Sequence, residues 1–235
     1  MRPRHADNHC SRAERKAAAG PWIKPLWGSV LILTLGLALT SLALQQDRLS
    51  QTMQQRYGDE GSAFLNAWLT LLGEQRDQPP IQQLEHINGF FNRHITFTED
   101  QLLWREKDYW ATPLQTMGVR GGDCEDFSIA KYISLLELGI PADKLRLIYV
   151  RAKTEGSVQA HMVLGYFTEP DAVPLILDNL NPDILPANKR TDLTPVFSFN
   201  SQGLWLGGQK SSSDPTARLS RWRDLLQRMR EEGFH

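Results

Sequence analysis

The sequence has few cysteines, little net charge and no internal repeat. Its 235 residues include only two cysteines, and 26 basic and 27 acidic side chains leave a formal charge of -1. Two cysteines exclude a small scaffold held by disulfides, and the balanced charge does not favour a nucleic-acid-binding protein, which normally has a strongly basic face. The composition, 41% hydrophobic and 23% charged, is typical of one globular domain or two small ones.

Basic residues cluster at the start of the chain. Residues 1–25 carry six bases and two acids, which leaves 20 bases and 25 acids for the rest, and residues 26–44 carry no charge at all. A basic flank before an apolar run indicates export. Its 19 residues approach the length of a membrane helix. The pattern fits a signal peptide cleaved near Ser41-Leu42-Ala43 or, slightly favoured, a retained inner-membrane anchor. A buried core helix would leave the basic flank unexplained.

Export changes the interpretation of the cysteines. Cys10 lies in the basic flank, so Cys124 is the one cysteine of the exported part. In an oxidising compartment a single cysteine is either a buried small side chain or a thiol with a chemical role. The polar surroundings Gly121-Gly122-Asp123-Cys124-Glu125-Asp126 favour the chemical role.

The exported part has the order of an α+β fold. Residues 45–58 are expected to form a polar, partly helical linker interrupted at Gly58, and residues 59–235 a single domain. Helical periodicity covers 63–72 and 81–91, Thr98-x-x-Gln101 resembles a capping box, and apolar spacing predicts a helix headed by Cys124. Branched and aromatic runs then predict antiparallel strands, before a last helix over 219–229. The strands are expected at 145–150, 159–167, 175–178, 195–199 and 204–206.

A nucleophilic thiol requires partners. The N-terminus of a helix stabilises a thiolate, and catalysis also needs an imidazole and a polar group that orients the imidazole. Of the six histidines only His161 lies in the predicted sheet, and Asp178 ends the next strand. A histidine in mid-strand is, taken alone, more often a core residue with a satisfied hydrogen bond. Neighbouring antiparallel strands nevertheless allow His161 and Asp178 to face each other.

These residues resemble a known family. The blocks Gly-Asp-Cys-Glu-Asp-Phe at 122–127, Gln-Ala-His-Met-Val-Leu at 159–164 and Leu-Asp-Asn-Leu at 177–180 occur in the order found in bacterial transglutaminase-like cysteine proteinases, specifically the LapG-type periplasmic proteases. The resemblance extends over roughly residues 109–206. It implies a papain/transglutaminase-like core with N-terminal helices and a catalytic triad of Cys124, His161 and Asp178.

Three acids surround the thiol and should raise its pKa. Asp123, Glu125 and Asp126 either complement the dipole of the helix that they begin or bind a cation such as Ca²⁺, which prefers carboxylate oxygens. The sequence contains no EF-hand loop, so the spacing alone does not decide. The resemblance implies a calcium site beside the nucleophile, with Asp123 and Glu125 as ligands and Asp126 as a further candidate.

The resemblance also implies a biological role. It predicts a calcium-dependent periplasmic endopeptidase that cuts the N-terminal region of a large repeat adhesin, releases the adhesin and disperses biofilm. It further implies inhibition by an inner-membrane cyclic-di-GMP receptor with a periplasmic domain. A peptidoglycan peptidase or acyl transferase of the same superfamily is the alternative, and a non-catalytic binding module is disfavoured by the complete set of triad side chains.

The backbone N–H of Cys124 is the expected oxyanion donor. A second donor, such as Tyr109 or Trp110, is not assigned.

Overall fold

The computed structural model describes the backbone of residues 27–234 and the side chains of residues 46–234. Two units divide the chain, with the boundary between Ser41 and Leu42. The predicted basic flank 1–25 with Cys10, and the side chains of the predicted signal or anchor segment 26–44, lie outside this description. Among the residues described, no helix has both the length and the apolar character needed to cross a bilayer.

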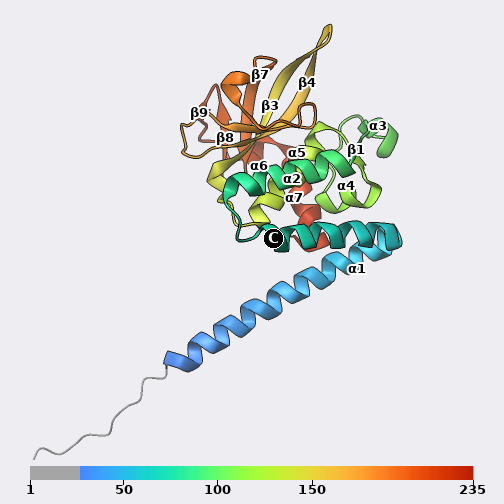
Figure 1. Ribbon diagram of the computed structural model, residues 1–235, viewed down its shortest axis with the longest axis vertical. Coiled ribbons are helices and arrows are strands. Elements are labelled where there is room, and N and C mark those ends of the chain that lie inside the picture. Colours follow the sequence, from blue (N-terminus) through green and yellow to red (C-terminus); the bar gives the residue numbers. More distant parts are fainter. Residues whose placement is uncertain (1–26, 235) are drawn as a thin grey trace, which may run out of the picture. The chain divides into compact units, whose positions relative to one another are not determined.

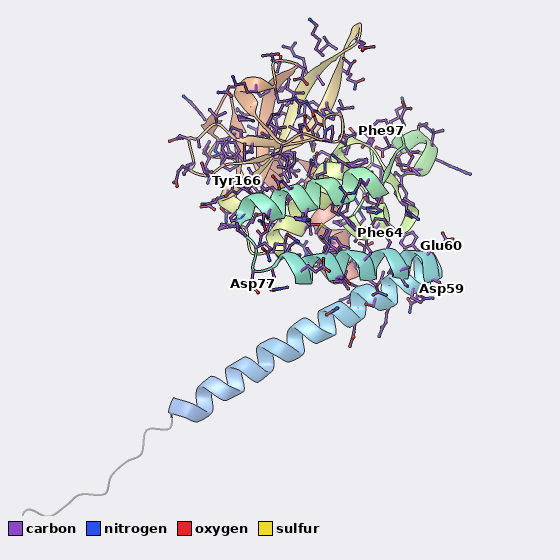
Figure 2. The ribbon with its side chains drawn as sticks, in the orientation of Figure 1. Asp59, Glu60, Phe64, Asp77, Phe97 and Tyr166 are labelled. Carbon is purple, nitrogen blue, oxygen red and sulfur yellow. The ribbon has the colours of Figure 1, made fainter. Side chains whose placement is uncertain are left out.

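The first helix bends where the sequence predicts an interruption. Helix α1, Trp27–Gln75, contains one non-helical residue, Gly58, with φ 63° and ψ -153°. A positive φ is a conformation that glycine adopts without steric cost. Asp59 and Glu60, labelled in Figure 2, begin the helical stretch after the bend.

The expected linker over residues 45–58 requires correction, because part of it belongs to the core. Leu49 and Met53 are 5% and 0% exposed and belong to the main hydrophobic cluster. Their spacing of four residues places them on one face of the helix. The segment is polar only on its other faces, which is why its composition resembles that of a linker.

The remaining helices follow the predicted order. The expected capping box at Thr98 and Gln101 is absent, since helix α3 (Asp100–Leu103) begins after Glu99 without a side-chain cap. A capping box is instead made by Thr112 and Gln115 at helix α4 (Pro113–Val119). The helices are α2 (Pro80–His94), α3 (Asp100–Leu103), α4 (Pro113–Val119), α5 (Cys124–Glu137), α6 (Pro215–Arg218) and α7 (Ser220–Glu232), with 3-10 turns at Ala142–Lys144 and Ala187–Lys189.

An antiparallel seven-stranded sheet forms the other layer, in the order β6-β5-β4-β3-β7-β8-β9. A separate parallel pair joins β1 (Thr96–Phe97) to β2 (Gly121–Gly122) just before the cysteine. The strands of the large sheet are β3 (Leu145–Thr154), β4 (Ser157–Tyr166), β5 (Leu175–Leu177), β6 (Leu185–Pro186), β7 (Leu193–Asn200), β8 (Gly203–Leu206) and β9 (Gln209–Lys210). All five predicted strands are present, which confirms the α+β order.

The main core lies between the helices and this sheet, as Figure 1 shows for α2, α5 and α7 beside β3 and β4. Phe64 of α1, labelled in Figure 2, packs edge-to-face on Phe90 of α2 at 5.3 Å between ring centroids. Trp68 of α1 donates a 2.8 Å hydrogen bond to Ser134 Oγ of α5. These contacts hold α1 and α2 against α5, the helix that carries Cys124 at its first position.

Candidate active site

Cys124 begins helix α5, as the sequence predicts. Its thiol is half-buried, and the next residues continue as a buried helix along the core. The parallel pair of β1 and β2 brings the chain to this point, so the backbone before the helix is held by hydrogen bonds such as Thr98 N to Gly122 O, 2.9 Å. The position is therefore fixed on both sides, and the N-terminal dipole of α5 points at the thiol.

His161 and Asp178 come together across strands β4 and β5. The pairing of Leu164 with Leu177 brings the two strands into register, and His161 Nε2 lies 2.8 Å from Asp178 Oδ1. The side chains are 2% and 0% exposed. Because Nε2 is used in this hydrogen bond, Nδ1 is the imidazole nitrogen left for a second partner.

Asp178 is held by more than the histidine. Its Oδ1 also accepts from the backbone N–H of Leu180 at 3.0 Å, and its Oδ2 accepts from Arg190 Nη2 at 2.7 Å. Burial alone would raise the pKa of Asp178, but the hydrogen bonds from His161, Leu180 and Arg190 outweigh it and lower the pKa to about 2. The carboxylate is therefore ionised at any physiological pH, as an orienting group for an imidazole requires.

The thiol and the imidazole line the same cavity, of about 600 Å³. Trp110, Tyr149 and Phe197 supply aromatic walls, and the start of α7 closes one side with Ser220 and Arg221. The backbone N–H of Met162, the residue after His161, forms a hydrogen bond with Cys124 that favours the thiolate, while Met162 O accepts from Ser128 Oγ at 3.0 Å. The edge of strand β4 thus contacts the N-terminal end of helix α5 at the thiol.

The acids around Cys124 oppose thiolate formation, as the sequence suggests. The Cys124 thiol donates to Glu125 Oε2 at 3.0 Å. Burial raises the pKa of Cys124, and the charges of Glu125 and Asp123 raise it further. Burial, and next the charge of Glu125, raises the pKa of Asp123 to about 9. An environment that makes several acids hard to ionise side by side favours a cation among them.

The acidic cluster is larger than the three residues predicted from sequence. Asp100 brings a carboxylate oxygen within 4.8 Å of those of Asp123 and Asp126, and Asp108 joins Asp100 and Glu125 in a second group. Asp100 Oδ1 and Asp123 Oδ1 are buried without a hydrogen-bond partner. Carboxylate oxygens without protein donors are what Ca²⁺ requires of its ligands, so these residues fit the ion.

Asp126 differs from the other acids of the cluster. It is completely buried, and both of its oxygens already accept from backbone N–H groups, Oδ1 from Ala111 at 2.8 Å and Oδ2 from Asp123 at 3.3 Å. Position 122 has no room for a side chain, because a Cβ there would lie 2.7 Å from both Cβ and Oδ2 of Asp126. Asp126 therefore organises the turn that carries the cluster.

Sequence reasoning missed four contributors to the site. Two of them, Asp100 and Asp108, flank a loop that contains Trp104. In the sequence, only their acidic side chains beside Trp104 and Tyr109 could have pointed to a role in the site. Nothing in the sequence marked Arg190, twelve residues beyond Asp178, as the partner of that carboxylate. Lys131, two turns into α5, is 1% exposed, and burial lowers its pKa to about 7 although the charge of Asp178 acts in the opposite direction.

The chain is similar in sequence and in fold to known proteins. The family described as bacterial transglutaminase-like cysteine proteinase BTLCP matches residues 72–203. LapG of Legionella pneumophila is 38% identical in sequence, over 78% of this chain and 97% of its own, with a TM-score of 0.67. An EGTA-treated form of that protein gives a TM-score of 0.69, and a calcium-bound form, 98% of which is covered, gives 0.68. No curated protein sequence matches the chain.

Proposed function

The chain belongs to the bacterial transglutaminase-like cysteine proteinases, and from this premise we propose that it is a calcium-dependent periplasmic endopeptidase of the LapG type. The observation that carries the proposal is the cavity shared by Cys124 and His161, with His161 held by the ionised Asp178. We assign the three residues as nucleophile, proton carrier and orienting group.

The proton path follows from the nitrogens of His161. Nδ1 accepts the thiol proton of Cys124, and the sulfur attacks a peptide carbonyl. The resulting imidazolium, stabilised by Asp178, returns the proton to the leaving amine. Water then releases the acyl group by the same route. The backbone N–H of Cys124 remains our candidate donor to the oxyanion, and Trp110, which lines the cavity, is a candidate neighbour of the substrate.

The edge of β4 suggests how a peptide binds. On the side away from β3, β4 pairs with β5 only at Leu164–Tyr166, so no strand of residues 27–234 lies beside residues 157–162 there. Both backbone groups of Met162 face Cys124 and Ser128 on this side. Because strand backbones repeat every two residues, Ala160 presents its N–H and C=O at the same edge, beside the cavity. We infer that substrate adds to this edge as an extended chain.

Calcium fits the acidic cluster, with Asp100, Asp123 and Glu125 as the first candidates for ligands and Asp108 and Asp126 as further members. Bound there, the ion would neutralise carboxylates that otherwise keep the thiol of Cys124 protonated. The calcium-bound Legionella protein supports this assignment.

The substrate and regulator are proposed from the same family resemblance: the N-terminal region of a large repeat adhesin, whose cleavage releases cells from biofilm, and an inhibitory inner-membrane cyclic-di-GMP receptor. An extended substrate segment suits the free edge of β4, because its backbone N–H and C=O groups can pair with those of the strand. Residues 26–44 remain our candidate for an inner-membrane anchor or signal, which would place the domain in the periplasm.

The decisive experiment incubates the protein with the N-terminal fragment of a co-encoded large adhesin, in calcium or in a calcium chelator. We expect cleavage with calcium, none with chelator, and none by Cys124→Ala; Cys10→Ala is the matched control and should cleave normally. Cleavage by Cys124→Ala would contradict the nucleophile, and cleavage in chelator the calcium dependence. No cleavage of the fragment by the native protein, together with hydrolysis of peptidoglycan crosslinks, would replace the proposal with the alternative activity.

A further inference from the structure

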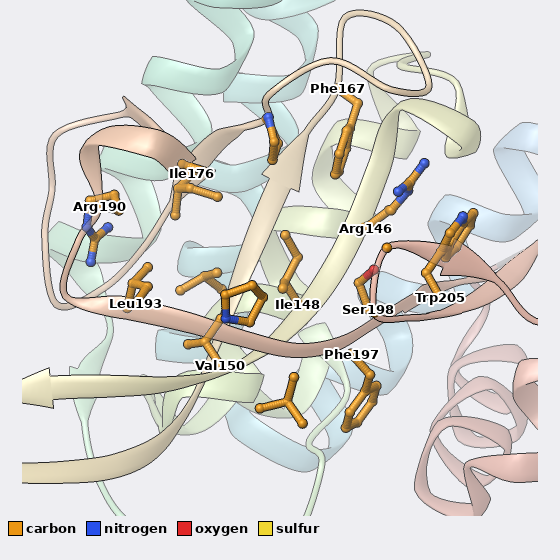
Figure 3. A pocket seen from close by; sticks show the side chains of 17 residues that line it. Arg146, Ile148, Val150, Phe167, Ile176, Arg190, Leu193, Phe197, Ser198 and Trp205 are labelled. Atoms are coloured by element: carbon orange, nitrogen blue, oxygen red, sulfur yellow. The ribbon is translucent and has the colours of Figure 1, made fainter.

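A second cavity, of about 350 Å³, lies on the sheet and is shown in Figure 3. It shares Phe197 with the cavity of Cys124 and His161. Its floor is the smaller hydrophobic cluster, made of Ile148 and Val150 from β3, Val163 from β4, Ile176 from β5, and Phe167. Val163 follows His161 by two residues, so both side chains leave β4 on the same face. The volume is within the range of cavities that bind small molecules.

Two buried arginines interrupt this apolar lining. Arg190, 3% exposed, and Arg146, 9% exposed, both line the cavity, and Figure 3 shows them at different ends of it. Each has a buried nitrogen without a hydrogen-bond partner among the described residues, Nη1 of Arg190 and Nε of Arg146. A buried donor left unpaired costs free energy, so both atoms indicate an absent acceptor.

The charges of the two arginines are compensated to different extents. Arg190 forms ion pairs with Asp178 and Asp192, each at 2.7 Å. Within the described part of the chain no carboxylate forms an ion pair with Arg146, whose Nη2 donates only to the carbonyl of Pro170 at 3.1 Å. Asp171 is near enough to favour the charged form, but burial outweighs it and lowers the pKa of Arg146.

Aromatic rings hold the uncompensated guanidinium in place. The Cζ atom of Arg146 lies 4.1 Å from the ring centroid of Phe167 and 4.1 Å from that of Trp205. Such stacking stabilises the cation and leaves only the in-plane N–H groups for a ligand. A carboxylate is the group that matches in-plane guanidinium donors.

We propose that this cavity binds a small molecule with an apolar chain and a single carboxylate, with the carboxylate on Arg146 and the chain over Ile148, Val163 and Ile176. The charge of Arg190 is already balanced by two acids, so its Nη1 would donate only to an uncharged acceptor of the ligand. The site shares Phe197 with the peptide-cleaving cavity, but Arg146, which would hold the carboxylate, lies outside the lining of that cavity.

Isothermal titration of the full-length protein tests the proposal with decanoate, with decanol as the uncharged chain of equal length and with acetate as the charge without the chain. We expect saturable binding of one decanoate per protein, at least tenfold weaker binding of decanol, and no binding of acetate. Equal affinity for decanoate and decanol would overturn the role of Arg146, and absence of decanoate binding would overturn the site.

Three variants locate the binding. Arg146→Met keeps the aliphatic stem and should lose at least tenfold in decanoate affinity, whereas Arg151→Met, an exposed arginine on the same strand, is the matched control and should change nothing. Val196→Trp, at the exposed rim, should block the cavity if Arg146→Met fails to fold. Undiminished decanoate binding by Val196→Trp would contradict the location. Self-association that Val196→Trp abolishes, without decanoate binding, would mean that a second copy occupies the cavity.

Discussion

His161 Nε2 and Asp178 Oδ1 lie 2.8 Å apart in a fully buried hydrogen bond that joins β4 to the end of β5. This bond directs the other nitrogen of the imidazole away from Asp178. Arg190 and the backbone of Leu180 hold the carboxylate from its other sides. The orientation of the histidine therefore depends on a carboxylate that cannot rotate.

Asp178→Asn should reduce kcat by about 10²- to 10⁴-fold, because an amide presents a donor or a weaker acceptor and no longer stabilises the imidazolium. The measurement is peptide hydrolysis at saturating substrate. Asp192→Asn is the matched control, since it also contacts Arg190 but has a side chain 44% exposed and no contact with His161. Equal losses in both variants would indicate that Arg190, and not the orientation of the histidine, carries the effect.

Gly122→Ala should weaken calcium binding by about 10- to 100-fold, the range for loss of groups that orient metal ligands. The added Cβ would lie 2.7 Å from Asp126 and displace the carboxylate that organises the cluster. The neighbouring Gly121→Ala is the control, since its Cβ would meet nothing nearer than 3.4 Å. Calcium titration of both proteins makes the comparison, and an unchanged affinity in Gly122→Ala would argue against the cluster as the site.

Lys131→Met should stabilise the fold, most strongly below pH 7. The pKa of this lysine falls to about 7 in the folded protein, below the unfolded value, so the unfolded chain binds more protons between these values and stability rises with pH. We expect a gain of about 2 to 4 kcal/mol in the free energy of unfolding at pH 7, shrinking as the pH approaches 10.

The check is urea unfolding of native protein and Lys131→Met at several pH values, with the exposed Lys153→Met as control. A gain that is the same at every pH would mean that packing, and not the buried charge, sets the effect.

Met53→Ala should lower the free energy of unfolding by about 2 to 5 kcal/mol, as expected for a methionine truncated in a core. Met53 is 0% exposed although it precedes the bend at Gly58. Gln51→Ala, on the exposed face of the same helix, should be nearly neutral. Thermal or urea unfolding distinguishes the two, and a neutral Met53→Ala would restore the description of residues 45–58 as a linker.

Local patterns were sufficient for the helix that Cys124 begins and for the antiparallel strands, because apolar periodicity and turn residues act over a few neighbouring positions. They also placed His161 within a strand and Asp178 at the end of the next one, so the pair was identified before any contact was visible. The same local patterns misplaced the capping box and described residues 45–58 by their polar faces alone.

The sequence by itself determined the chemistry that is available: a single cysteine after the apolar run of residues 26–44, a histidine and an aspartate on adjacent strands, and acids beside the thiol. Tertiary structure decided which further groups act on them. Asp100 reaches the acidic cluster because β1 pairs with β2, Arg190 reaches Asp178 through the loop after β5, and Arg146 is caged by rings from two separate segments. These partners are distant along the chain, and only the packing of the sheet and helices brings their charges together.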